Sequence, residues 1–318
     1  MKPPSSCSYV GIDVSKDYWD VALDGEDNVR RYPAIPKGLQ RLLGHLATLQ
    51  NVRVCLEATG GWERGLVDAL HRHAISVAVV NPRQIRDFAR AMNQLAKTDA
   101  IDARVIARFA ALMDPTPHEK PSENQEKLRS LRTRRNQVVD MLTQEKNRLA
   151  TQHDPEIRQW IERTIEWHQQ QLKEIDQQLQ QRIEVDASLR QKAALLTSVP
   201  GVAMATASAL LTEMPELGNL NRREAARLAG LAPINRDSGK SRGKRMIGGG
   251  RSTVRRALYM ATLVATRFNP RIRRHYQHLL SQGKKKLVAL AACMRKLLLI
   301  LNTILKTNTP WTYPANSP

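Results

Sequence analysis

Asp99 and Asp102 lie three residues apart in the stretch KTDAIDARVIARFA, where the spacing of apolar residues predicts the start of a helix. Residues at positions i and i+3 share one side of a helix, so both carboxylates are expected to point the same way. Two acids there also suit the positive first turn of any helix. The pair alone therefore has both a structural and a chemical interpretation.

Two further acids are predicted to lie at the ends of strands. Asp13 interrupts the apolar run YVGIDVS, and Glu57 ends the run VRVCLE just before two glycines. α/β folds place their chemistry at strand ends, so both side chains are candidates for a site. The simpler interpretations are that Asp13 starts a turn with Ser15 and that Glu57 is solvated.

Four carboxylates from three separate elements would repel one another and raise their pKa values if they met unpaired. A divalent cation removes this penalty, and a set of oxygen ligands without imidazole or thiolate favours magnesium, with manganese as the alternative. Two such ions about 3.5–4 Å apart would activate a nucleophile and stabilise the leaving oxygen in phosphoryl transfer. The acids thus predict a metal-dependent catalytic site, with these ligands: Asp13, Glu57, Asp99 and Asp102.

The stretch RDSGKSRGKRMIGGGRSTVRR combines glycines with basic residues, and a helix is expected to begin near Ser252. This composition suits a segment that binds phosphates and orders on contact. Ser238 and Ser241 place hydroxyls among these cations, and a serine there can attack a phosphodiester to form a phosphoserine bond. Asp-Ser-Gly is also a common turn. The residues expected to bind nucleic acid are Arg236, Lys240, Arg242, Lys244, Arg245, Arg251, Arg255 and Arg256.

The first 118 residues are expected to form an α/β domain. YVGIDVS and YWDVALD predict a hairpin with NVRRYPA as a third strand, and VRVCLEAT and ISVAVVN predict two more strands. Helices are expected over about 39–49, 62–73 and 82–92, and from Asp99 onward. Antiparallel strands followed by strand–helix alternation predict a mixed sheet with helices on its faces.

Residues 119–187 carry apolar side chains at three–four spacing on both sides of the break QHDPE. The pattern predicts two long helices with heptad character that pair antiparallel or mediate self-association, although two ordinary helices would show it too. Residues 188–318 are expected to be mainly helical. The Pro-Gly turn in SVPGVAMATASALLTEM is typical of helix-hairpin-helix elements, which can present backbone N–H groups to a phosphate. Any two consecutive helices can share such a turn.

The composition favours a polyanion as partner, because 50 Lys and Arg against 30 Asp and Glu give a net charge of +20. The 3 scattered cysteines, without a Cys/His cluster, argue against a zinc site or a disulfide framework and favour a reducing cytosol. The N-terminal stretch lacks the apolar run of a signal peptide, and the longest apolar runs near the C-terminus are interrupted by charges. A cytoplasmic location without membrane contact is therefore expected.

Four stretches together resemble the DEDD transposases of bacterial RNA-guided insertion sequences, the insertion-sequence 110 family. They are YVGIDVSKD, CLEATGGWE, VVNPRQIRDFARAMNQLAKTDAIDARVIARFA and LAGLAPINRDSGKSRGKRMIGGGRSTVRRALYMATLVA. The resemblance implies an α/β ribonuclease H-like (RuvC-like resolvase) domain over 1–118, a coiled-coil linker over 119–187 and a helical transposase domain over 188–318. It also implies that Asp13, Glu57, Asp99 and Asp102 bind magnesium and that Ser238 is the nucleophile.

The same resemblance implies donor and target double-stranded DNA and a structured noncoding guide (bridge) RNA as partners. It implies assembly into a dimer or tetramer and a bacterial, nucleoid-associated location. The nearest alternative is a metal-dependent Holliday-junction-type nuclease that uses activated water. GIDVSK also suggests an actin-like sugar kinase, but no glycine-rich adenosine segment follows it. A non-enzymatic nucleic-acid-binding protein is the third.

Overall fold

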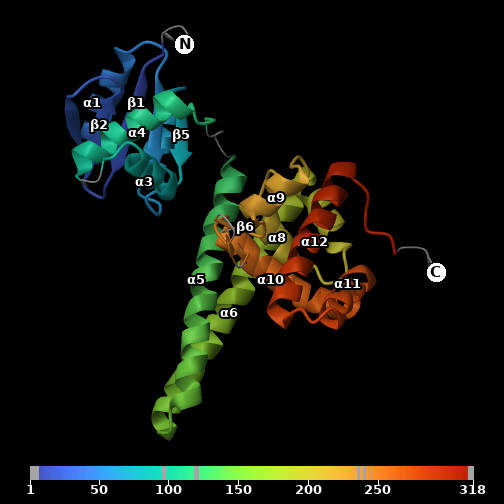
Figure 1. The fold of residues 1–318 in the computed structure, drawn as a ribbon. Helices are drawn as coiled ribbons and strands as arrows, with labels where there is room; N and C mark the ends of the chain where they lie inside the picture. The colour runs from blue at the N-terminus through green and yellow to red at the C-terminus, as the bar shows by residue number, and fades with distance from the viewer. Residues whose placement is uncertain are drawn as a thin grey trace. The chain divides into compact units, whose positions relative to one another are not determined.

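The computed structural model describes residues 7–94, 98–117, 122–234, 237–238, 241–243 and 245–313, without the side chains of residues 100, 237–238 and 241–242. The chain divides into two compact units, residues 1–120 and residues 121–318 (Figure 1). The first is a mixed α/β unit and the second is mainly helical. The finer division into three parts remains a prediction.

A five-stranded sheet in the order β3-β2-β1-β4-β5 organises the first unit. The first three strands are antiparallel, and β4 and β5 run parallel to β1. The hairpin, the third strand and the mixed sheet expected from the sequence are all confirmed. The strands are β1 (Tyr9–Val14), β2 (Tyr18–Leu23), β3 (Val29–Pro33), β4 (Arg53–Glu57) and β5 (Ser76–Val80).

Helices cover both faces of this sheet because its central strands are apolar on both sides. Ile12 and Leu56 point to one face, where they pack with Leu42 of α1 and Leu70 of α2. Cys55 points to the other face and packs against α3 and α4. The helices are α1 (Pro36–Ala47), α2 (Arg64–Arg72), α3 (Pro82–Ala91) and α4 (Asp99–Met113).

Unit 2 opens with α5 (Glu123–Thr151) and α6 (Pro155–Val185), which pack on one another within the chain. Leu131 and Val138 of α5 lie in one apolar cluster with Ile175 and Leu179 of α6. The bidentate ion pair between Arg135 and Asp176, with N–O distances of 2.6 and 3.0 Å, joins the two helices. Arg135 can therefore lie beside the apolar side chains of this interface, because Asp176 neutralises it from the facing helix.

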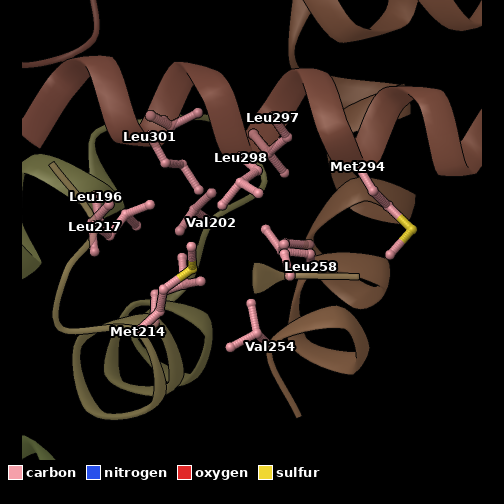
Figure 2. Close-up of a cluster of buried hydrophobic side chains, with 14 of the residues drawn as sticks. Leu196, Val202, Met214, Leu217, Val254, Leu258, Met294, Leu297, Leu298 and Leu301 are labelled. Carbon is pink, nitrogen blue, oxygen red and sulfur yellow. The ribbon is translucent and has the colours of Figure 1, made fainter. Parts of the chain in front are cut away.

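The largest core of unit 2 lies among the helices that follow α6 (Figure 2). Leu297, Leu298 and Leu301 of α12 point into it, toward Met214 and Leu258. The elements are α7 (Ala187–Thr197), α8 (Met204–Glu213), α9 (Arg222–Leu228), α10 (Ser252–Phe268), α11 (Pro270–Ser281) and α12 (Lys286–Thr307). The turn between α7 and α8 brings Gly201, with φ of +98°, against the backbone of Ala265, where no side chain fits.

Helix α12 is long and apolar enough, by length and composition, to cross a membrane. Its apolar stretch is 56% buried within the protein, which is typical of a helix at the centre of a helical core. The run of leucines therefore has a packing explanation in unit 2.

Candidate active site

Gly11 allows α4 to lie directly on β1. A Cβ atom at this position would overlap the backbone of Ala103 and Ala107, two small residues on the facing side of α4. Side chains alternate along a strand, so Asp13 points to the same face as Gly11. Close packing at Gly11 therefore sets Asp13 beside the first turn of α4.

Glu57 reaches the same face of the sheet by strand register. Gly11 of β1 is aligned with Cys55 of the parallel strand β4, and Asp13 and Glu57 each lie two residues further along. Both side chains are intermediate in exposure. Their strands thus place the two carboxylates at the same level of the sheet.

Thr98 fixes the start of α4, because its hydroxyl accepts a hydrogen bond from the backbone N–H of Ile101. Asp99 and Asp102 then fall in the first turn, as the sequence predicts. The structure brings all four acids to one cavity of about 290 Å³. This cavity, called the acidic cavity below, is lined by Asp13, Glu57, Asp99, Asp102, Gln94 and residues of α3.

Burial and neighbouring acids both make ionisation of Asp13 unfavourable. Partial burial raises the pKa of the Asp13 carboxyl to about 6, and the negative charges of Asp102, Asp99 and Glu57 contribute further. Asp20, which lies directly opposite Asp13 on β2, adds a smaller effect of the same sign. The acidic cavity thus concentrates negative charge that a cation would relieve.

Arg31 is a cation already present at this cluster. Its guanidinium donates two hydrogen bonds to the buried Asp20, at 2.9 and 2.8 Å, and a third to Asp99 at 3.1 Å. It also lies over the ring of Tyr18, 5.3 Å from the ring centre. One of the four predicted ligands therefore has an arginine partner in this structure.

Carboxylate oxygens are the donors that a hard divalent cation prefers, so the chemistry of the acidic cavity fits magnesium or manganese. Among the residues that the structure describes, no three acidic, histidine or cysteine side chains are grouped closely enough to hold an ion as they stand. Asp99, which lines the cavity, also accepts a hydrogen bond from Arg31. The donor set fits the cation, and its members are neighbours.

Helix α3 brings positive charge to the rim of the same cavity. Arg86 and Arg90 both line it, and both side chains are exposed. Asn81 caps α3 by accepting a hydrogen bond from the backbone N–H of Arg83, which fixes the start of the helix. An acidic cavity with a basic rim suits a phosphodiester, because the rim can hold the phosphate backbone beside the acids.

The segment that carries the candidate nucleophile forms two short antiparallel pairs before α10. β6 (Pro233–Ile234) pairs with β9 (Met246–Ile247), and β7 (Asp237–Ser238) pairs with β8 (Ser241–Arg242). Ser238 and Ser241 are directly opposite in register. The side chains of both serines lie outside the described residues, as do those of Arg236, Lys240, Arg242 and Lys244.

Three of the remaining basic residues of this segment have partners within unit 2. Arg251 makes a bidentate ion pair with Glu216 at 2.7 Å and also donates to the carbonyl of Glu213. Arg255 donates to the carbonyl of Gly249, and Arg256 to Asp140 of α5. Arg245 is exposed. The partners of Arg251 indicate an anchoring role at the start of α10.

Asp20 and Arg31 are members of the acidic cluster that the sequence analysis did not identify. Asp20 is an acid in the middle of the apolar strand YWDVALD, and its side chain is buried. Arg31 lies directly opposite it on β3. The sequence does show an acid within an apolar strand. Recognising that it faces both Asp13 and Arg31 requires the register of β2 with β1 and with β3.

Comparisons with known proteins identify the family to which the chain belongs. The DEDD transposase model of the IS110 family matches residues 10–154, and a model described as "Transposase IS116/IS110/IS902 family" matches residues 193–277. The pilin gene-inverting protein of Moraxella bovis is 27% identical over 96% of this chain and 98% of its own length. The counterpart from Moraxella lacunata gives the same figures.

A third relative is the insertion element IS110 uncharacterized 43.6 kDa protein of Streptomyces coelicolor. It is 31% identical over 36% of this chain and 29% of its own length. The two matching models lie in the order of the two structural units and cover most of the chain. The chain therefore belongs to the IS110 family of transposases and is a DNA recombinase or transposase.

Proposed function

We propose that the protein is an RNA-guided transposase that cleaves and rejoins the DNA strands of an insertion sequence. The observation that carries this proposal is the acidic cavity, where four carboxylates and two arginines line one space. The Moraxella relatives are named for inverting a gene, and inversion requires cutting and rejoining of strands without loss of DNA. A reaction that conserves the broken bond in a covalent intermediate meets this requirement.

The proposed ligands of a magnesium ion, with manganese as the alternative, are Asp13, Glu57, Asp99 and Asp102. When bound, such an ion supplies charge stabilisation at the oxygens of the reacting phosphate. Arg31 would then give up its hydrogen bond to Asp99 and keep the two that it donates to Asp20. Arg86 and Arg90 would hold the DNA backbone at the rim of the acidic cavity.

Ser238 is the proposed nucleophile. Its hydroxyl oxygen attacks the phosphorus, a P–O bond of the DNA breaks, and a phosphoserine linkage and a free hydroxyl end of the DNA result. The proton lost by Ser238 balances the proton gained by the leaving oxygen. Attack by a hydroxyl end on the phosphoserine reverses these changes and restores the strand, so no external energy source is needed.

Further parts of the proposal concern assembly. The first unit would have a RuvC-like ribonuclease H fold, and α5 with α6 would act as a coiled coil in a dimer or tetramer. A structured bridge RNA would pair with donor and target DNA in the bacterial cytoplasm, at the nucleoid. The Lys and Arg residues of the segment around Ser238 would bind nucleic acid, whereas Arg251 is proposed to stabilise the start of α10.

Trapping of a covalent protein–DNA adduct tests the nucleophile. Labelled DNA with the ends of the element is incubated with magnesium, the protein and the RNA encoded beside its gene, and adducts are separated on denaturing gels. The wild type and Ser241→Ala are expected to form the adduct, whereas Ser238→Ala forms none and still binds DNA. Cleavage by Ser238→Ala without an adduct would instead favour the water-using nuclease. Recombination that survives ribonuclease treatment would contradict RNA guidance.

A further inference from the structure

Unit 2 contains a second positively charged site, separate from the serine segment in sequence. A groove of about 950 Å³ lies between α11, α12, the start of α9 and the residues that follow α12. Its basic residues are Arg222 from α9, Arg271, Arg274 and His275 from α11, and Lys296 from α12. We call it the α11–α12 groove.

Helical spacing aligns these cations. Arg271 and Arg274 are three residues apart and Arg271 and His275 four, so all three lie on one side of α11. Lys296 faces them from α12, followed on the same side by Ile300 and Thr303. The positive groups of two helices therefore converge on one space.

Their charges are not balanced by acids. Arg222, Arg271, Arg274 and Lys296 make no ion pair with any acidic side chain in the described part of the protein. The sequence contributes to this, because residues 238–318, which include three of these four cations, contain 17 Lys and Arg and no Asp or Glu. An excess of like charge in a groove creates a strong positive potential for a polyanion.

Burial and like charge both disfavour the protonated forms of two basic groups in the groove. Partial burial and the nearby charges of Arg271 and Arg274 lower the pKa of the Lys296 ammonium. Partial burial and the charge of Lys296 lower the pKa of the His275 imidazole. Both lowered pKa values mean that the protonated forms are disfavoured in the groove, and a bound anion would favour them again.

The groove is held in place by a buried amide. Asn302 of α12 accepts a hydrogen bond from the backbone N–H of Gly218 and donates one to the carbonyl of Leu220, both at 2.8 Å. These bonds fix the segment that leads into α9 and therefore the position of Arg222. The site is thus built on two helices and a connection held by hydrogen bonds.

We propose that the α11–α12 groove binds the phosphodiester backbone of a nucleic acid. The inference rests on the proposed function, because DNA or RNA is its ligand, and it adds a phosphate-binding surface beyond the acidic cavity and the serine segment. Arginine and lysine side chains from two helices match the repeated charges of a strand, and each phosphate that they neutralise releases counterions.

The test compares two triple variants of the full-length protein by fluorescence anisotropy over a series of salt concentrations. The groove variant carries Arg271→Gln, Arg274→Gln and Lys296→Gln. The control carries Lys146→Gln, Arg163→Gln and Lys173→Gln, which removes the same charge from exposed positions of α5 and α6. The probes are a 30-base-pair DNA duplex and a structured RNA hairpin.

The groove variant is expected to reduce the slope of log K against log salt by about 2 to 3, since each contact with duplex DNA contributes about 0.9. A loss on one probe or on both supports the proposal and identifies the strand that occupies the groove. A slope equal to that of the control triple variant overturns it while leaving the proposed function intact. If the wild type binds neither probe, the proposed function fails as well.

Folding of the variants is checked by thermal unfolding. The groove variant should unfold at or above the temperature of the wild type, because it loses repelling charges. A charge-preserving variant, Arg271→Lys with Arg274→Lys, is expected to keep the salt slope. If the triple variant does not fold, Arg274→Gln against Lys173→Gln gives the same comparison, with an expected loss of about one slope unit.

Discussion

Arg31 and Asp99 are joined by a hydrogen bond of 3.1 Å, although they lie 68 residues apart in the sequence. The same guanidinium holds the buried carboxylate of Asp20. Arg31 thereby pairs with one predicted metal ligand, Asp99. It also orients Asp20, which lies opposite a second predicted ligand, Asp13. The acidic cavity is consequently a cluster of acids with its own internal cation.

Replacement of Arg31 tests this internal cation. Arg31→Gln removes a competitor for Asp99, so we expect manganese to bind about two- to fivefold more tightly, the range for competition with one exposed ion pair. The metal-free variant should unfold at a lower temperature, since the buried Asp20 loses its partner. Calorimetric titration with Mn²⁺ measures the affinity, and thermal unfolding scans of the metal-free protein measure the stability. Arg30→Gln, a change at the neighbouring exposed residue, is the control, and weaker metal binding by Arg31→Gln would argue against competition.

Asp13→Asn should change how stability depends on pH in the metal-free protein. The pKa of the Asp13 carboxyl is raised to about 6 from 3.8, so ionisation costs stability as the pH rises through this interval. In EDTA at pH 8 the variant should be more stable than the wild type by about 1 kcal/mol, a value reduced for the partial exposure of the group. At pH 4 the difference should vanish. Denaturant unfolding at both pH values measures it, and an equal difference at both would refute the assignment.

Gly11→Ala tests the close packing that positions α4. An added methyl group overlaps the backbone of Ala103 and Ala107, so we expect a loss of about 3 kcal/mol in unfolding free energy, or a shift of α4. Strand cleavage should fall with it. Gly44→Ala in α1 has open space and should be neutral or stabilising by up to about 1 kcal/mol. Similar behaviour of the two variants would contradict the proposed contact.

Arg251 and Arg245 offer a matched pair near the serine segment. Arg251→Gln removes the ion pair with Glu216 and should destabilise the protein by about 1–2 kcal/mol with little change in the salt dependence of DNA binding. Arg245→Gln should leave stability nearly unchanged and reduce the salt dependence of DNA binding, because this residue is exposed and is expected to contact phosphate. Unfolding measurements and anisotropy titrations on both variants separate the two roles. An exchange of the outcomes would reverse the assignment.

Much of the first unit was predictable because its signals are local. The apolar runs identify β1, β2 and β4, and Thr98 with the acids that follow marks the start of α4. The expected helix over 39–49 begins earlier, at Pro36, because proline favours the first helical position. The Asp20–Arg31 pair depends on strand register, which residue types alone do not specify.

The short strands between Pro233 and Ile247 were not predicted, since two-residue strands leave too little alternation to detect, and the segment was expected to order only on contact with phosphates. The partner of Arg251 was missed for a related reason. Glu216 lies 35 residues away, and only the packing of unit 2 brings it to the start of α10. The acids of the acidic cavity were easier to predict from the sequence, because each of them lies near the end of a strand or in the first turn of a helix.

The most direct test of this account is a titration of Mn²⁺ followed by its electron paramagnetic resonance signal, with magnesium as competitor. The wild type and the exposed-site control Asp17→Asn should bind the ion. Asp13→Asn, Glu57→Gln, Asp99→Asn and Asp102→Asn should each weaken binding at least about tenfold, because each removes one charged ligand. Equal binding by the wild type and all four variants, or no binding by the wild type, would contradict a shared metal site in the acidic cavity.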